Sequence, residues 1–119
     1  MTSLGELRQQ RHARWMADLK QSVNTLVAAQ RGRRAAPDQI YLFGSRAPGD
    51  WDGLSDTDLL VVSVNRADAE HWADTLLDHG LGQDVIALDH EGWRQLPEHP
   101  SVIWRHVARD AQPLLGVRP

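Results

Sequence analysis

The sequence predicts an α/β protein in which a small mixed β-sheet is packed with helices, forming a single domain over residues 1–119. Two observations support this class. Segments with helical apolar spacing alternate along the chain with short segments rich in β-branched and aromatic residues. The first two strand segments are joined by a turn-rich stretch and should pair directly, whereas a helical segment joins the second to the third.

The first expected element is a long amphipathic helix over about residues 4–31. Few residues in this range disfavour a helix, and Gly32 is placed to end it. Its apolar residues recur at helical spacing: Trp15, Leu19, Val23, Leu26 and Val27. The basic run over 31–34 is interpreted as the last helical turn, where cations suit the helix dipole, rather than as a nucleic-acid patch.

A catalytic core is expected over about residues 39–110. Gln39–Phe43 is predicted to be a strand that enters a loop over 44–55, and Thr57–Val64 is the clearest strand of the chain. Asn65 could cap a helix over about 66–79. The apolar stripe expected on that helix consists of Trp72, Leu76 and Leu77.

The last third of the chain predicts one more strand and two more helices. Asp84–Leu88 forms the third strand, and a short helix follows over about 91–96. Ser101 is a plausible cap for a final helix that reaches about Asp110. Residues from Pro113 onward are expected to be a tail.

Paired carboxylates at the start of the second strand predict a metal site. Alternation along a strand would place Asp56 and Asp58 on one face, with Cβ atoms about 6–7 Å apart. Two carboxylates so close would repel each other unless a cation lay between them. Mg²⁺ prefers carboxylate oxygens together with substrate phosphates, so this pair suits a metal-bound phosphate ligand.

The turn after the first strand predicts a phosphate site beside that metal site. Gly44 allows a sharp turn and a close backbone approach to a ligand. Ser45 and Arg46 can begin a helical turn whose free N–H groups favour phosphate. The Ser45 hydroxyl and the Arg46 guanidinium would add a donor and a positive charge.

With these residues in place, the chain resembles the DNA polymerase beta-like nucleotidyltransferase superfamily and, within it, the minimal nucleotidyltransferases. The resemblance covers about residues 40–115 and centres on Gly44-Ser45, ten intervening residues, and Asp56-Thr57-Asp58. It implies the polymerase beta-like fold, two Mg²⁺ ions held by the two aspartates, and a triphosphate held at the Gly-Ser turn.

The resemblance also implies a third carboxylate on the next strand. Asp84, followed by Val85 and Ile86, matches that position and would help to bind the second metal and to activate the incoming hydroxyl. Asp89 is the competing candidate, but it ends its strand, where a turn or cap role is the simpler interpretation. Trp51, between the two halves of the motif, could stack on the base or pack within the loop.

By the same resemblance, the protein would transfer AMP from ATP to a tyrosine of a cognate HEPN ribonuclease toxin, and so act as an antitoxin. Two alternatives remain: a module that neutralises the toxin by contact alone, and an enzyme that modifies a small molecule such as an aminoglycoside. The second strand is apolar on both faces, so a partner subunit or self-association is also expected.

Composition narrows the expected partners and location. The net charge of −3 provides no overall attraction to nucleic acid. No apolar run approaches the roughly 20 residues of a membrane span. The first residues lack the apolar core of a signal peptide, so a cytoplasmic protein is expected. The absence of cysteine excludes disulfides, thiolate nucleophiles and cysteine zinc sites.

Overall fold

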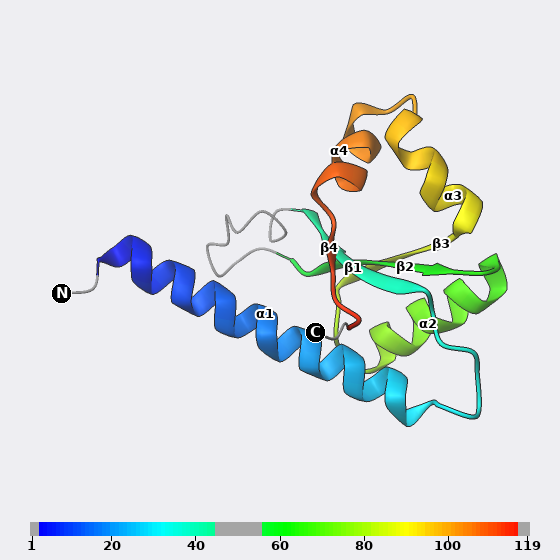
Figure 1. Ribbon diagram of the computed structural model, residues 1–119, viewed down its shortest axis with the longest axis horizontal. Coiled ribbons are helices and arrows are strands. Elements are labelled where there is room, and N and C mark those ends of the chain that lie inside the picture. The colour runs from blue at the N-terminus through cyan, green and yellow to red at the C-terminus, as the bar shows by residue number, and fades with distance from the viewer. Residues whose placement is uncertain (1–2, 45–55, 117–119) are drawn as a thin grey trace.

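The computed structural model describes residues 3–44 and 56–116. In these ranges four strands form one mixed sheet, with helices on both of its faces (Figure 1). The elements in chain order are α1 (Leu4–Ala29), β1 (Gln39–Phe43), β2 (Asp58–Ser63), α2 (Arg66–Asp78), β3 (Asp84–Asp89), α3 (His90–Gln95), the 3₁₀ helix η2 (Leu96–Glu98), α4 (Val102–Asp110) and β4 (Gln112–Pro113). The predicted fold class is confirmed.

The sheet has the strand order β3-β2-β1-β4. β1 pairs antiparallel with β2, as expected for strands joined by a short connection. β2 pairs parallel with β3, and α2 forms the crossover that a parallel pair requires. The predicted direct pairing of the first two strands and the helical connection to the third are both confirmed.

Strand β2 is the centre of the core, because both of its faces are buried by the protein's own chain. Leu59 and Val61 pack in the cluster that α1 and α2 form on one face of the sheet. Leu60 and Val62 pack in a second cluster, which residues of η2 and α4 close on the other face. Both apolar faces of β2 are thus covered within the chain, so they give no argument for a partner subunit.

Helix α1 begins where Ser3 accepts a hydrogen bond from the backbone N–H of Glu6, at 3.0 Å. Its second half packs on the sheet through Leu19, Val23 and Leu26, whereas its first turns project beyond the sheet (Figure 1). The helix ends at Ala29, so the basic run over 31–34 follows the helix and does not occupy its last turn. The interpretation of that run as part of the helix is thus wrong.

Helix α2 begins as predicted at Asn65, whose side chain accepts from the backbone N–H of Asp68 at 2.8 Å. Trp72 and Leu76 are fully buried, and the indole N–H of Trp72 donates to the carbonyl oxygen of Ala35 at 3.0 Å. Leu77 is 41% exposed, so its predicted place in the buried stripe is wrong. Only one face of α2 contacts the sheet, and Leu77 lies beyond that face.

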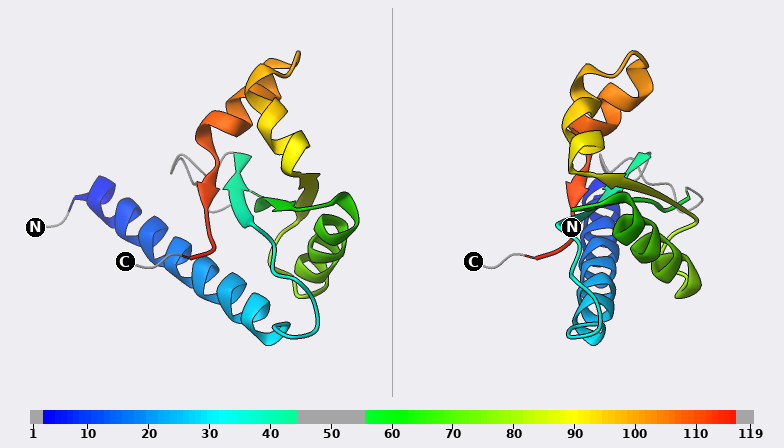
Figure 2. Two further views of the ribbon diagram at one scale, coloured as in Figure 1. Left: turned by 45° about the vertical axis from the view of Figure 1, so that its right-hand side comes forward. Right: turned by 90° about the vertical axis from the view of Figure 1, so that its right-hand side faces the viewer.

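The C-terminal segment is the main departure from the prediction. Gln112–Pro113 forms β4 beside β1, and Leu114 is 1% exposed with its N–H donating to the carbonyl oxygen of Ile40 at 2.8 Å (Figure 2). The predicted tail is therefore part of the sheet and core up to this point. Ser101 precedes α4 as expected, but its side chain makes no capping hydrogen bond.

No helix in the described ranges combines the length and apolar character that crossing a membrane requires.

Candidate functional site

The predicted acidic residues lie at one end of the sheet, where three strand termini meet. Phe43, the last residue of β1, is opposite Asp58, the first residue of β2. Asp58 is in turn opposite Asp84, the first residue of β3. The sheet thus brings together two carboxylates that are 26 positions apart in the chain. Gly44 follows directly after the β1 terminus at the same end.

Strand alternation also places these residues on one face of the sheet. Residues two positions apart on a strand point to the same face, so Asp58 shares a face with Leu60, and Asp84 shares a face with Ile86. Leu60 and Ile86 both belong to the cluster beneath α3 and α4, so the two carboxylates lie on that face. Asp56 precedes the assigned start of β2, so the expectation that strand alternation aligns it with Asp58 stays a prediction.

The three carboxylates lie close enough to affect the ionisation of the central one. Burial raises the pKa of Asp58 above its ordinary value, and the neighbouring charges of Asp84 and then Asp56 raise it further. Asp58 is half-buried, whereas Asp56 and Asp84 are exposed. A cation near Asp58 would offset this repulsion and stabilise the ionised carboxylates.

Gly44 makes the close backbone approach that the sequence predicts. Its φ of +83° lies in the left-handed region that favours glycine. A Cβ at this position would lie only 2.6 Å from Oδ2 of Asp58, so any other residue here would require the Asp58 carboxylate to move. The turn after β1 therefore lies directly against the central carboxylate. Ser45, Arg46 and Trp51 lie outside the described residues.

The donor set fits a hard divalent cation. Carboxylate oxygens are the protein ligands that Mg²⁺ prefers, and Asp56, Asp58 and Asp84 supply them at one end of the sheet. Within residues 3–44 and 56–116, no group of three or more His, Asp or Glu side chains is placed to hold a metal ion. Asp56 and Asp84 are exposed, so their side chains would have to turn toward Asp58 to share an ion with it.

Asp89 lies at the opposite end of β3 from Asp84 and has a structural role. Its Oδ1 accepts a hydrogen bond from the backbone N–H of Gly92 at 2.7 Å and caps α3. The cap interpretation of Asp89 is thus confirmed.

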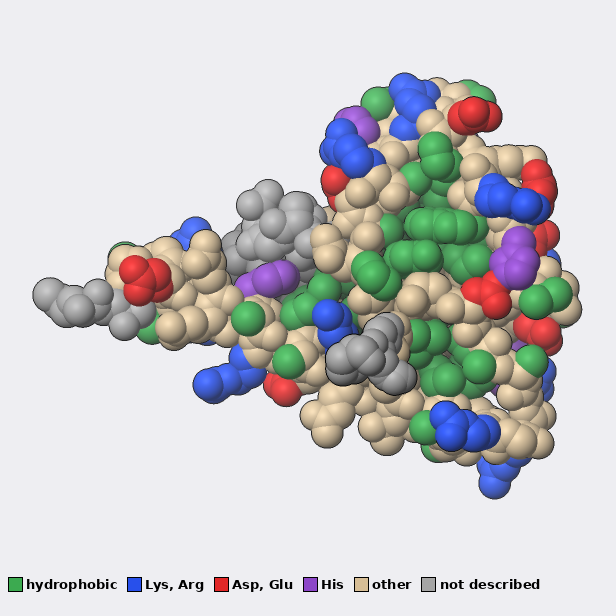
Figure 3. Space-filling model, in the orientation of Figure 1, with side chains coloured by type: hydrophobic (Ala, Val, Ile, Leu, Met, Phe, Trp, Pro, Cys, Tyr) green, Lys and Arg blue, Asp and Glu red, His purple; other side chains and the backbone are tan. Residues whose placement is uncertain are grey.

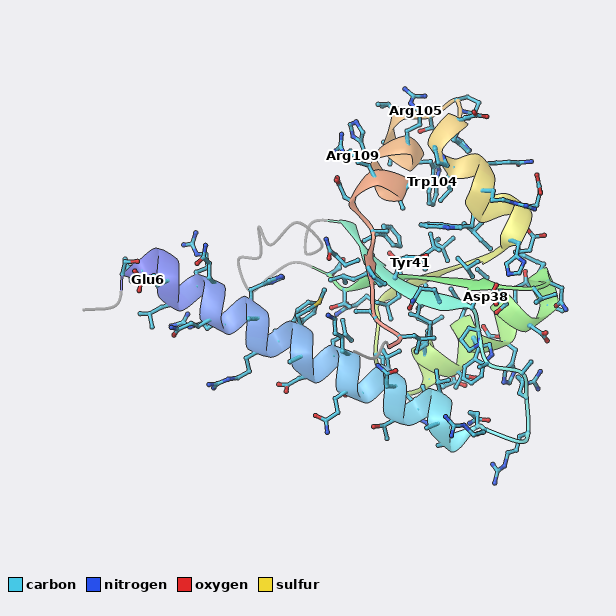
Figure 4. The ribbon with its side chains drawn as sticks, viewed as in Figure 1. Glu6, Asp38, Tyr41, Trp104, Arg105 and Arg109 are labelled. Atoms are coloured by element: carbon cyan, nitrogen blue, oxygen red, sulfur yellow. The ribbon has the colours of Figure 1, made fainter. Side chains whose placement is uncertain are left out.

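Two aromatic pairs on the same face of the sheet as Asp58 and Asp84 are not evident from the sequence. Phe43 lies beside Trp104 of α4 with ring centroids 6.4 Å apart, and Tyr41 stacks on Trp93 of α3 at 4.3 Å. Burial, followed by the charge of Asp38, raises the pKa of Tyr41. Figure 4 labels Tyr41 and Trp104, and hydrophobic side chains gather at the surface between the α3–α4 pair and the sheet (Figure 3). The one sequence signal for these aromatic contacts was the position of Phe43 directly before Gly44.

The sheet places carboxylates at neighbouring strand starts, and a glycine turn lies against them. This arrangement suits an enzyme that handles phosphates through a metal ion. The sequence matches the family described as nucleotidyltransferase domain over residues 25–100. Because this match spans more than half of the chain, the protein belongs to that family and is a nucleotidyltransferase-type transferase.

One solved structure shares the fold. It is a Sulfolobus solfataricus protein described as a "putative nucleotidyltransferase", and it aligns with a TM-score of 0.51 and 22% identity. The alignment covers 89% of this chain and 85% of that one. At this identity the likeness concerns the fold alone. No curated protein matches the sequence.

Proposed function

We propose that the protein transfers AMP from ATP, with Mg²⁺, to a hydroxyl group of another protein. The acceptor we favour is a tyrosine of a cognate HEPN toxin, which would make the protein an antitoxin that acts in the cytoplasm. The observation that carries the proposal is the pairing of Asp58 with Asp84 at neighbouring strand starts, with Gly44 packed against Asp58. The family match supports nucleotidyl transfer in general.

Each residue of the site has a role in this proposal. Asp56 and Asp58 would hold the metal ions, with Asp84 as the third ligand. The backbone at Gly44, with the side chains of Ser45 and Arg46, would hold the triphosphate. Bound Mg²⁺ would neutralise phosphate charge and favour the deprotonated acceptor hydroxyl.

The transfer itself is a displacement at the α-phosphorus. The acceptor oxygen forms a new bond to the α-phosphorus, and the bond from that phosphorus to the oxygen bridging to the β-phosphate breaks. Pyrophosphate leaves with the electron pair of the broken bond. The acceptor hydroxyl loses its proton to the Asp84 carboxylate, which is exposed at the start of β3.

The replacement Asp84→Asn tests the catalytic role, because it keeps the shape of the side chain and removes its charge. With a candidate helical toxin, Mg²⁺ and ATP, the unmodified protein should add one or more AMP masses to the toxin by intact mass spectrometry. The variant should add none while still co-eluting with the toxin. Asp89→Asn is the matched control, since Asn caps helices as well as Asp does and this residue is remote from the site.

Two results would contradict the proposal. AMP transfer by Asp84→Asn at the rate of Asp89→Asn would remove Asp84 from the chemistry. Equal silencing of the toxin by both variants, without AMP on the toxin, would show that contact alone neutralises it.

A further inference from the structure

Strand β3 forms a free edge of the sheet. In the described part of the chain, β2 lies on one side of β3 and no strand pairs with the other. None of its six residues is buried, and the strand lies between α3 and α2 in the right-hand view of Figure 2. A free edge presents backbone donors and acceptors to which another chain can pair.

The outward-facing groups belong to alternate residues of β3. The N–H of Asp84 is directed to the carbonyl oxygen of Thr57 on the β2 side, at 3.4 Å. By strand alternation, the N–H and C=O groups of Val85 and Ala87 face away from β2. The strand contains no proline or lysine, which are common protections of sheet edges.

A groove runs along each face of this edge. On the α2 side, a groove of about 380 Å³ is lined by Val85 and Ala87 together with Ala73 and Leu77 of α2. On the other face, a groove of about 350 Å³ is lined by side chains that include Ile86, Leu88, Leu96 and Trp104. An added strand directs alternate side chains to opposite faces, so these grooves would receive its two sets of side chains.

The charges at this edge favour a basic segment of another protein over a second copy of this chain. Glu70, Asp74 and Arg66 are the charged residues that line the α2-side groove. Glu70 is paired with Arg66, whereas Asp74 has no ion pair among the described residues. Two copies joined symmetrically through this edge would pair antiparallel, so Asp84 at the start of each β3 would lie near Asp89 at the end of the other, and like charges opposite each other are unfavourable.

We propose that the free edge of β3 binds an extended, basic segment of the acceptor protein as an additional strand. Directly opposite residues on neighbouring strands point to the same face, and the strands lie about 4.8 Å apart. A residue opposite Asp84 would therefore direct its side chain to the face of the sheet that carries the carboxylates. A hydroxyl-bearing residue at that position would be the acceptor. The second part of this inference depends on the proposed function, whereas the docking itself does not.

The probe is a nine-residue peptide with a central tyrosine in an alternating lysine and valine sequence. Its binding to the full chain is measured without nucleotide by fluorescence anisotropy, and amide exchange is followed by NMR. We expect saturable binding and new protection at the amides of Val85 and Ala87. The same peptide N-methylated on the residues that flank the tyrosine keeps its side chains and charge, but it should bind at least about tenfold more weakly.

The variant Ala87→Pro removes one outward donor while leaving the β2 ladder intact, since proline is tolerated at such edge positions. It should also weaken peptide binding by about tenfold, with Mg-ATP binding unchanged. Ala67→Pro is the matched control, because proline is tolerated in the first turn of α2. If Ala87→Pro disturbs the circular dichroism spectrum, the methylated peptide decides the question.

Three outcomes would overturn the docking proposal: no saturable binding, equal binding of both peptides, or a doubled mass in sedimentation with Val85 protected before peptide is added. The last would identify a second copy as the occupant. AMP transfer to both peptides alike would reject docking and leave the proposed function standing. Edge-dependent binding without any AMP transfer would reject the proposed function and leave the docking standing.

Discussion

Replacement of Gly44 by alanine tests whether the turn after β1 positions the Asp58 carboxylate. The new Cβ would lie 2.6 Å from Oδ2 of Asp58, so the carboxylate must move away. The φ of +83° adds strain of roughly 1–2 kcal/mol for any residue with a Cβ. In a domain of this size, that strain corresponds to a melting temperature lower by about 3–10 °C. Because Asp58 is a candidate metal ligand, its displacement should weaken Mg-ATP binding by about 10–100-fold.

Gly32→Ala is the matched control for this experiment. Gly32 has a φ of +87°, and nothing lies within 4 Å of a Cβ added there. Both variants should lose thermal stability from the backbone strain, and Gly44→Ala should lose at least as much as Gly32→Ala, as measured by differential scanning calorimetry. Only Gly44→Ala should lose Mg-ATP affinity, as measured by isothermal titration calorimetry. Equal affinity in both variants would refute the argument that Gly44 positions Asp58 for the ligand.

Three further predictions follow from particular residues. Replacing both Asp56 and Asp58 by Asn should abolish Mg²⁺-dependent ATP binding in calorimetry, and unchanged affinity would place the metal site elsewhere. Tyr41 is the chain's one tyrosine, so its absorbance at high pH reports it alone; burial raises its pKa above 10.0, so the titration should centre above that value. Since the folded-state pKa of Tyr41 is raised, its contribution to stability is lost as the pH rises through that pKa. The free energy of unfolding of Tyr41→Phe should therefore fall less at alkaline pH than that of the unmodified protein. Trp72→Phe should lower the free energy of unfolding, measured with urea, by about 1–3 kcal/mol, because the Ala35 carbonyl loses its donor. A smaller effect would mean that water replaces the indole.

Several elements could be predicted from short stretches of sequence. β1 was predicted with its observed bounds, and Asn65 was predicted to begin α2. The strand at β2 was evident from its run of apolar residues. A strand's side-chain pattern and a helix cap depend on residues only a few positions apart, so the local sequence contains the information that they require.

The candidate site was only partly predictable. Asp56, Asp58 and Gly44 belong to one motif, and the family resemblance added Asp84. The resemblance could not show that Asp84 lies opposite Asp58, because that register depends on how α2 places β3 against β2. The contact of Phe43 with Trp104 could not be predicted for the same reason, because α4 reaches the sheet from far along the chain.

The sequence by itself determined the α/β class, the positions of most strands and helices, and the motif that places the chain among nucleotidyltransferases. Only the tertiary structure decided that Gln112–Pro113 would be a strand, that both faces of β2 would be covered, and that Leu77 would be exposed. These features depend on contacts between residues far apart in the chain. The free energy of such contacts comes from burial and backbone pairing across elements, and no local pattern encodes it.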